Sequence, residues 1–179
     1  MTENKPTVFI ITGKTGSGKT TFLVRLIKRL REQGLTVTGF LAVRSVTKEP
    51  DQEYDIHLLD SGKSIPLASR ESVKDWIKIY NFYFSPEAIR CGNRILNDPQ
   101  ISNKDLVVVD EIGIFELEGK VWADSVSLLV SKSNNIMIWV VRDTILEKVI
   151  RKWDIQDPVI LDIEKVSIGQ AEKRILSEF

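Results

Sequence analysis

The chain has 179 residues, of which 42% are hydrophobic and 28% charged, and its 25 basic residues balance its 25 acidic ones. This length suits one folded domain over residues 1–179, and the composition excludes a disordered chain. The neutral balance gives no electrostatic reason to expect nucleic acid or a membrane as partner, and no apolar run approaches the roughly 20 residues that span a bilayer.

Cysteine and histidine occur once each, as Cys91 and His57. A single cysteine excludes an internal disulfide and a cysteine metal cluster, and a single histidine excludes a multi-histidine metal centre. The first six residues form no hydrophobic signal core, so we expect a cytoplasmic protein. No pattern determines the oligomeric state, and a monomer is the simpler expectation.

The first predicted element is a buried strand at 7–12, and an amphipathic helix at 19–33 follows it closely. Between them lies a glycine-rich run with the spacing G-x-x-x-x-G-K-[ST] of a Walker A P-loop. Its residues, with the threonine that follows, are Gly13, Lys14, Thr15, Gly16, Ser17, Gly18, Lys19, Thr20 and Thr21.

Each part of this run suits the binding of a nucleotide phosphate. The glycines let backbone N–H groups approach phosphate oxygens, and the start of a helix favours negative charge. Lys19 would reach the β- and γ-phosphates, and the Thr20 hydroxyl would ligate Mg²⁺. The alternative is a glycine-rich turn capped by threonine, which leaves a cation at a helix start unexplained.

The next predicted strand, at 35–43, completes a βαβ unit, and an insertion follows it. Residues 54–59 and 64–68 are separated by a turn and predict a β-hairpin within 44–70. The segment up to residue 84 is then rich in aromatic side chains, which either contact a ligand or pack in the core beneath the insertion. We favour core packing for them. They are Trp76, Tyr80, Phe82, Tyr83 and Phe84.

A second chemical motif follows a helix predicted at 85–97. The apolar strand at 105–109 ends in two acids, Asp110 and Glu111, which downstream of a P-loop form a Walker B arrangement. Asp110 would hold Mg²⁺ directly or through water, and Glu111 would polarise an attacking water. A hydrolase needs such a base near the γ-phosphate, whereas a phosphate-binding scaffold does not.

Arg142 follows another apolar strand. It would lie at the carboxyl end of the sheet, where ligands bind in such folds, and it is our candidate for a cation that stabilises the transition state. An ion pair with Asp143 or Glu147 is the alternative. The elements predicted after Glu111 are a loop at 112–117, helices at 120–132, 144–152 and 169–179, and strands at 135–141 and 158–163.

With both motifs in place, the chain resembles the THEP-type, or cancer-related, nucleoside-triphosphatase family. The resemblance is carried by the P-loop at 13–21, by the hairpin region between Gly39 and Arg70, and above all by the acidic motif from Asp110 to Leu117. It implies an α/β fold of the RecA-like P-loop type, a three-layer sandwich with a mostly parallel central sheet and the inserted β-hairpin. It also implies slow Mg²⁺-dependent hydrolysis of nucleoside triphosphates.

Three stretches depart from the pattern of that family. The family usually has Lys-Met where this chain has Ile114 and Phe115, and a polar turn at 48–53 replaces a turn richer in glycine and arginine. The segment 71–84 is also unusually aromatic. These differences bear on substrate preference more than on the phosphate site.

We therefore expect an enzyme that hydrolyses ATP, GTP and other nucleoside triphosphates to diphosphate and phosphate with Mg²⁺, using Lys19, Glu111 and Arg142 as catalytic residues. Broad base specificity is expected because no Asn/Thr-Lys-x-Asp guanine signature is present. Two alternatives stay open. One is a kinase for a nucleoside or nucleotide, with the insertion and aromatic segment as an acceptor lid. The other is a nucleotide-binding accessory protein, which would release no phosphate.

Overall fold

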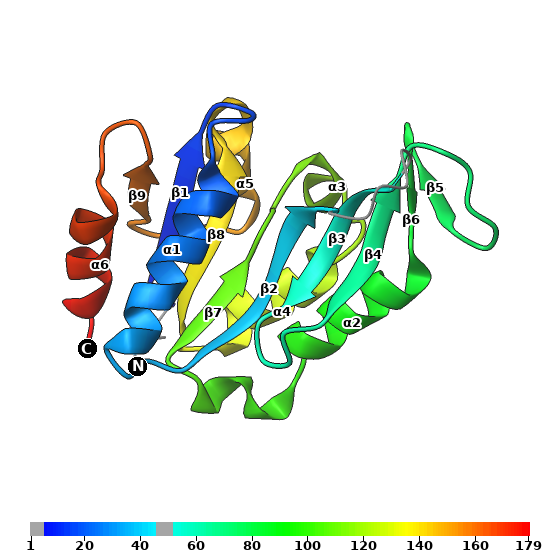
Figure 1. Cartoon of the computed structure of the whole chain (residues 1–179). Coiled ribbons are helices and arrows are strands. Elements are labelled where there is room, and N and C mark those ends of the chain that lie inside the picture. Colours follow the sequence, from blue (N-terminus) through cyan, green and yellow to red (C-terminus); the bar gives the residue numbers. More distant parts are fainter. Residues whose placement is uncertain (1–5, 46–51) are drawn as a thin grey trace.

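The computed structural model describes residues 6–45 and 52–179, and Figure 1 shows their arrangement. Within these residues nine strands form one sheet, in the order β5-β6-β4-β3-β2-β7-β8-β1-β9. The strands are β1 (Val8–Gly13), β2 (Val37–Arg44), β3 (Gln52–Leu58), β4 (Ser64–Ser69), β5 (Ile77–Ile79), β6 (Phe82–Phe84), β7 (Leu106–Val109), β8 (Ile136–Arg142) and β9 (Val159–Asp162).

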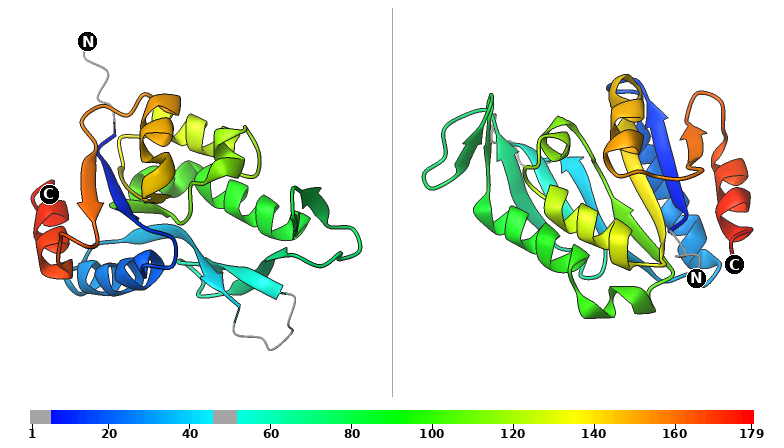
Figure 2. Two further views of the ribbon diagram at one scale, coloured as in Figure 1. Left: turned by 90° about the horizontal axis from the view of Figure 1, so that it is seen from above. Right: turned by 180° about the vertical axis from the view of Figure 1, so that it is seen from behind.

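Helices cover both faces of this sheet, which confirms the predicted three-layer α/β sandwich (Figures 1 and 2). One face carries α1 and α6, and the other carries α2, α4 and α5. The helices are α1 (Lys19–Glu32), α2 (Pro86–Leu96), α3 (Ile114–Leu117), α4 (Ala123–Lys132), α5 (Leu146–Lys152) and α6 (Ile168–Leu176), with 3-10 turns at Pro99–Asn103 and Asp143–Ile145.

The centre of the sheet is parallel, as predicted. Strands β2, β7, β8, β1 and β9 all run in one direction. Their side chains alternate between two cores: Val8 and Ile10 of β1 face the layer of α2, α4 and α5, whereas Phe9 and Ile11 face α1 and α6. Because both faces are covered, these strands are continuous apolar runs in the sequence.

Strand β8 lies between the P-loop strand β1 and the acid-bearing strand β7, and this order positions the site. Gly13 at the end of β1 is in register with Arg142 at the end of β8. Strand β7 ends earlier, at Val109, and the segment after it runs beside the end of β8, where the Ile112 N–H donates to the Val140 carbonyl oxygen at 2.9 Å. The two acids that follow β7 therefore come beside Arg142.

The predicted insertion forms an antiparallel extension of the sheet. Strands β3 and β4 make the expected hairpin, and the aromatic segment adds a second hairpin of β5 and β6 that we did not predict. Of its five aromatic residues Phe84 is buried in the core and Phe82 packs, partly exposed, against it, so the favoured interpretation of core packing holds for these two residues. The predicted polar turn at 48–53 lies mostly outside the described residues.

The predicted loop at 112–117 contains the one-turn helix α3. The Glu116 carboxylate accepts the N–H of Gly113 at 2.8 Å and so caps the helix from within. A single turn is too short to produce a periodic apolar pattern, which is why the sequence indicated a loop. The predicted cap of α2 is confirmed, since the Ser85 hydroxyl accepts the Ala88 N–H.

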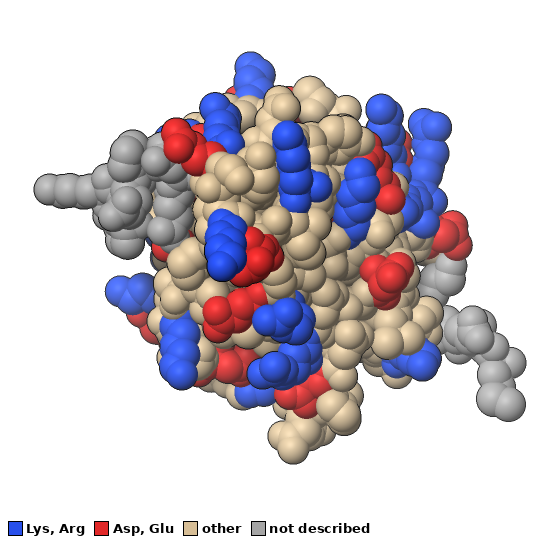
Figure 3. Space-filling view, turned by 90° about the vertical axis from the view of Figure 1, so that its right-hand side faces the viewer, with Lys and Arg blue, Asp and Glu red and all other residues tan. Residues whose placement is uncertain are grey.

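The surface at the β5–β6 edge mixes charges of both signs. Figure 3 shows Lys and Arg side chains interspersed with Asp and Glu on this face. No helix in the described parts of the chain has the length and apolar character needed to cross a membrane.

We expect Gly39→Ala to destabilise the sheet strongly. Gly39 has a φ of +111°, and an added Cβ would overlap the backbone of Val108 in the neighbouring strand. Strain and overlap together should lower the free energy of unfolding by about 3 kcal/mol or more, measured by urea denaturation. Gly34→Ala is the matched control, because Gly34 also has a positive φ of +90° but faces open space. Equal losses in the two variants would contradict the role of the close strand contact.

Candidate active site

The glycine-rich run forms a tight loop between β1 and α1. Gly16 and Gly18 have φ of 75° and 92°, a conformation that strains any side chain. The Ser17 N–H and hydroxyl both donate to the Lys14 carbonyl oxygen, at 3.2 and 2.7 Å, and close the turn. Among the described residues, no side chain caps the start of α1 and its first turn holds no acid, so its N–H groups are available to an anion.

Lys19 is buried, and its side chain folds back onto this loop. Its ammonium donates to the carbonyl oxygens of Gly13 and Lys14, at 2.9 and 2.7 Å. Burial lowers the pKa of Lys19 below 10.5, and the nearby Glu111 carboxylate opposes that shift. An anion in the loop would stabilise the charged form further.

Asp110 is the most deeply buried acid of the site, with 1% of its surface exposed. Its carboxyl group interacts with the Thr20 hydroxyl and with the Ala42 N–H. Its Oδ2 atom has no hydrogen-bond partner among the residues that the structure describes. Burial, and then the neighbouring Glu111 carboxylate, raise the pKa of Asp110 to about 8.

This arrangement fits a small divalent cation. The Thr20 hydroxyl and the Asp110 carboxylate are hard oxygen ligands, and the orphaned Oδ2 atom is a buried acceptor in need of a positive partner. The described residues contain no group of three or more His, Cys, Asp and Glu side chains that could hold a metal. A cation here would therefore complete its shell with phosphate oxygens and water, as Mg²⁺ does at nucleotide sites.

Glu111 and Arg142 form an ion pair in which Arg142 Nε donates to Glu111 Oε1 at 2.7 Å. Both side chains are partly exposed. The sequence suggested phosphate, Asp143 or Glu147 as the partner of Arg142, and the pairing with Glu111 was missed. No local pattern could have revealed it, because it depends on β8 lying beside β7 in the sheet.

Glu116 is a second buried acid that the sequence indicated only as part of a motif. It is 3% exposed, and burial raises its pKa to about 7 despite its bond from the Gly113 N–H. Its spacing of three residues from Gly113 matches the acidic half of a capping box, but Gly113 has no side chain to complete that motif, so the sequence gives only a weak signal for α3.

A cavity of about 1000 Å³ brings these groups together. Its walls include the P-loop, Glu111 and Glu116, and Arg142. It extends from there past β2 to side chains of β3, β4 and β6. The predicted site residues Lys19, Glu111 and Arg142 thus share one concave space, whereas Asp110 is buried and does not line it.

Several known proteins are similar to this chain. The nucleoside-triphosphatase THEP1 of Hyperthermus butylicus is 31% identical over 109 residues, which cover 60% of this chain and 57% of that protein. THEP1 of Sulfolobus acidocaldarius is 33% identical over 114 residues, or 64% of each chain. The chain thus spans about three-fifths of the length of these curated relatives. THEP1 of Thermotoga maritima is 25% identical over 171 residues, covering 94% of this chain and 92% of that one.

Two solved structures share the fold. A human cancer-related nucleoside triphosphatase superposes with a TM-score of 0.70 and 18% identity, and covers 96% of both chains. THEP1 from Aquifex aeolicus superposes with a TM-score of 0.67. It is also 18% identical and covers 96% of both chains. These likenesses confirm the predicted fold class.

A family model described as NTPase matches residues 8–176, from the P-loop strand to the last helix. The predicted resemblance to the THEP-type proteins is confirmed, and the chain belongs to this NTPase family.

Proposed function

We propose that this chain hydrolyses nucleoside triphosphates to diphosphate and phosphate in a Mg²⁺-dependent reaction. The observation that carries the proposal is the Glu111–Arg142 ion pair, which lies in the same cavity as the P-loop and Lys19. A carboxylate beside the phosphate loop can orient water, and a guanidinium beside it can neutralise charge on the transferred group. A protein that only binds nucleotide requires neither group. The names of the similar THEP1 proteins support the same activity.

Different residues of the chain would bind the phosphates, orient the water and stabilise the developing charge. Backbone N–H groups of the loop and the Lys19 ammonium bind the β- and γ-phosphates and neutralise their charge. The Glu111 carboxylate orients a water molecule in line with the γ-phosphate, and Arg142 lies where it can contact the oxygens of that phosphate as charge shifts.

Thr20 and Asp110 are the residues that would hold Mg²⁺. When bound, the metal supplies positive charge to the β- and γ-phosphate oxygens. We expect the nucleobase of the triphosphate to contribute little to its recognition. Among the described residues, the cavity walls next to the loop contain no Asn-Lys-x-Asp or Thr-Lys-x-Asp segment, so we propose ATP and GTP among several substrates.

Glu111→Gln should retain nucleotide binding and lose turnover. The amide keeps the size of the side chain but cannot accept a proton, so kcat should fall by about 100-fold or more. Phosphate release with ATP, GTP, CTP and UTP measures turnover, and calorimetry with a non-hydrolysable analogue measures binding. Lys19→Ala should lose both. Glu147→Gln, on the exposed side of α5, is the matched control. Unchanged turnover in Glu111→Gln would remove Glu111 from this role.

Arg142→Ala should lower kcat by about 100-fold or more while changing KM only a few-fold, because its cation is needed most in the transition state. Steady-state phosphate release measures both constants. Arg151→Ala, an exposed arginine on α5, serves as the comparison. A rise in KM with kcat preserved would instead indicate that Arg142 only binds ground-state phosphate.

Removal of divalent cations with a chelator should abolish phosphate release, and added Mg²⁺ should restore it. Thr20→Val should raise the Mg²⁺ concentration for half-maximal activity at least tenfold, since a ligand oxygen is lost, and Thr20→Ser should restore the normal value. Full activity in the chelator would refute the metal assignment. If no nucleotide gives Mg²⁺-dependent release, the accessory-protein alternative is favoured.

A further inference from the structure

The candidate hydrolytic groups occupy only one end of their cavity. Beyond Glu111 the cavity continues toward β3, β4 and β6, where no residue has a role in hydrolysis. We call this part the aromatic compartment. Its rings come from β3, β6, α3 and the turn before α4, and they are Tyr54, Phe82, Phe84, Phe115 and Trp122.

These rings form a wall that is only partly covered. Phe115 meets Phe84 and Phe82 edge to face, with ring centroids 5.0 and 6.3 Å apart. Phe84 is buried, but Phe82, Phe115 and Tyr54 remain partly exposed. Partly exposed aromatic rings in a concave wall are the surface that a planar ligand would cover.

Trp122 adds a polar feature to this wall. It is 3% exposed, and its indole N–H has no hydrogen-bond partner within the described part of the chain. A buried donor without a partner is unfavourable, and a ligand with an acceptor atom would satisfy it. The Trp139 N–H also lacks a partner among the residues that the structure describes, but Trp139 lies in the core and does not line the cavity.

Two cations lie on the same cavity wall. Arg25 of α1 and Arg44 at the end of β2 are exposed, and neither forms an ion pair with another described residue. In contrast, Arg142 pairs with Glu111, and Arg70 pairs with Glu53 at 3.0 Å. Unpaired guanidinium groups bind phosphate readily. The wall therefore combines an anion-binding part with an aromatic part.

The strand order indicates which end of a bound nucleoside triphosphate lies nearest to the aromatic compartment. From the P-loop strand, the sheet runs β1, β8, β7, β2, β3, β4 and β6. Lys19 and the Thr20–Asp110 pair mark the β- and γ-phosphates, and Glu111 marks the side from which a nucleophile attacks. The aromatic compartment lies beyond Glu111 on that side. It is thus placed for the attacking group rather than for the nucleoside of the triphosphate.

We propose that the aromatic compartment binds a second substrate, a nucleoside monophosphate, which accepts the γ-phosphoryl group. Its planar base would lie against Phe82 and Phe115, and its phosphate would bind Arg25 and Arg44. This inference rests on the proposed function, because both reactions use the same loop and the same attacking side.

The transfer needs no group beyond those present. A phosphate oxygen of the acceptor attacks the γ-phosphorus as the bond from that phosphorus to the β–γ bridging oxygen breaks. A new phosphoanhydride forms and a nucleoside diphosphate leaves. Any proton on the attacking oxygen passes to the Glu111 carboxylate. Hydrolysis is the same displacement with water as the nucleophile.

The test is transfer of label from γ-³²P-ATP to AMP, GMP, CMP or UMP in the presence of Mg²⁺. The four nucleosides and ribose 5-phosphate are included to separate the contributions of ring and phosphate. We expect label on at least one monophosphate and none on ribose 5-phosphate. Phe82→Ala and Arg44→Ala should each lower the ratio of transferred to released phosphate at least tenfold.

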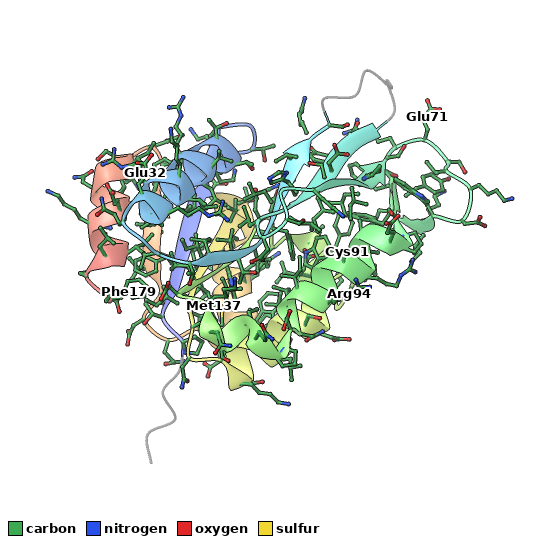
Figure 4. The ribbon with its side chains drawn as sticks, turned by 60° about the horizontal axis from the view of Figure 1, so that its bottom comes forward. Glu32, Glu71, Cys91, Arg94, Met137 and Phe179 are labelled. Carbon is green, nitrogen blue, oxygen red and sulfur yellow. The ribbon has the colours of Figure 1, made fainter. Side chains whose placement is uncertain are left out.

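Matched controls come from residues outside the cavity. Tyr83 is next to Phe82 but on the other face of β6, where the Lys78 ammonium lies 5.6 Å from its ring centroid. Arg94 lies on α2 (Figure 4). Tyr83→Ala and Arg94→Ala should leave the ratio unchanged. Because Arg44 is exposed, its variant remains informative even if Phe82→Ala fails to fold.

Three results would overturn the inference. One is label in inorganic phosphate alone with all four monophosphates. Another is an equal fall of the ratio in the Phe82 and Tyr83 variants. The third is a tenfold rise in KM for ATP in Phe82→Ala without acceptor, which would mean that the compartment holds the base of ATP itself. Phosphate release without transfer refutes only this inference, whereas transfer without release to water refutes only the hydrolysis proposal.

Discussion

A carboxyl group with 1% of its surface exposed ionises only if the protein or a ligand supplies compensating charge, and Asp110 is such a group. The Thr20 hydroxyl and one backbone N–H compensate in part, yet one carboxyl oxygen has no partner among the described residues and the pKa stands at about 8. A cation bound in the cavity would lower that pKa and favour the ionised form. Since Thr20 belongs to the P-loop, the contact between Thr20 and Asp110 joins the loop electrostatically to the end of β7, where we propose that the cation binds.

Strand β8 positions a second charged pair of the site, Arg142 and Glu111. By lying between β1 and β7 it places Arg142 beside Glu111, and the ion pair orients that carboxylate at the edge of the loop. An arginine has further N–H donors that this single bond leaves unused. The same side chain can therefore fix Glu111 and contact a phosphate, which is why its loss should affect turnover more than binding.

Local patterns predicted those parts of the site that local chemistry builds. The loop from Gly13 to Thr21 and the acids Asp110 and Glu111 each follow an apolar strand, so their place at the carboxyl edge of a parallel sheet could be inferred. The Glu111–Arg142 pair could not be inferred, because it depends on the order of the strands in the sheet, and no local sequence pattern reveals that order. The β5–β6 hairpin and α3 were missed for a different reason: strands of three residues and a helix of four are too short to give a period.

The aromatic compartment joins two features that looked unrelated in the sequence. The residues at 114 and 115 differ from the Lys-Met usual in the family that the chain resembles, and the segment before Ser85 is unusually aromatic. In the structure Phe115 contacts both Phe82 and Phe84, and Ile114 is 53% exposed on the same cavity wall. A lysine at position 114 and a methionine at position 115 would add a cation and remove the Phe115 ring that contacts Phe82 and Phe84. These two departures are thus one change to one surface, on the side of the site where we propose that the nucleophile enters, while the phosphate loop keeps its pattern. Differences in substrate from the relatives should therefore concern the attacking molecule more than the triphosphate.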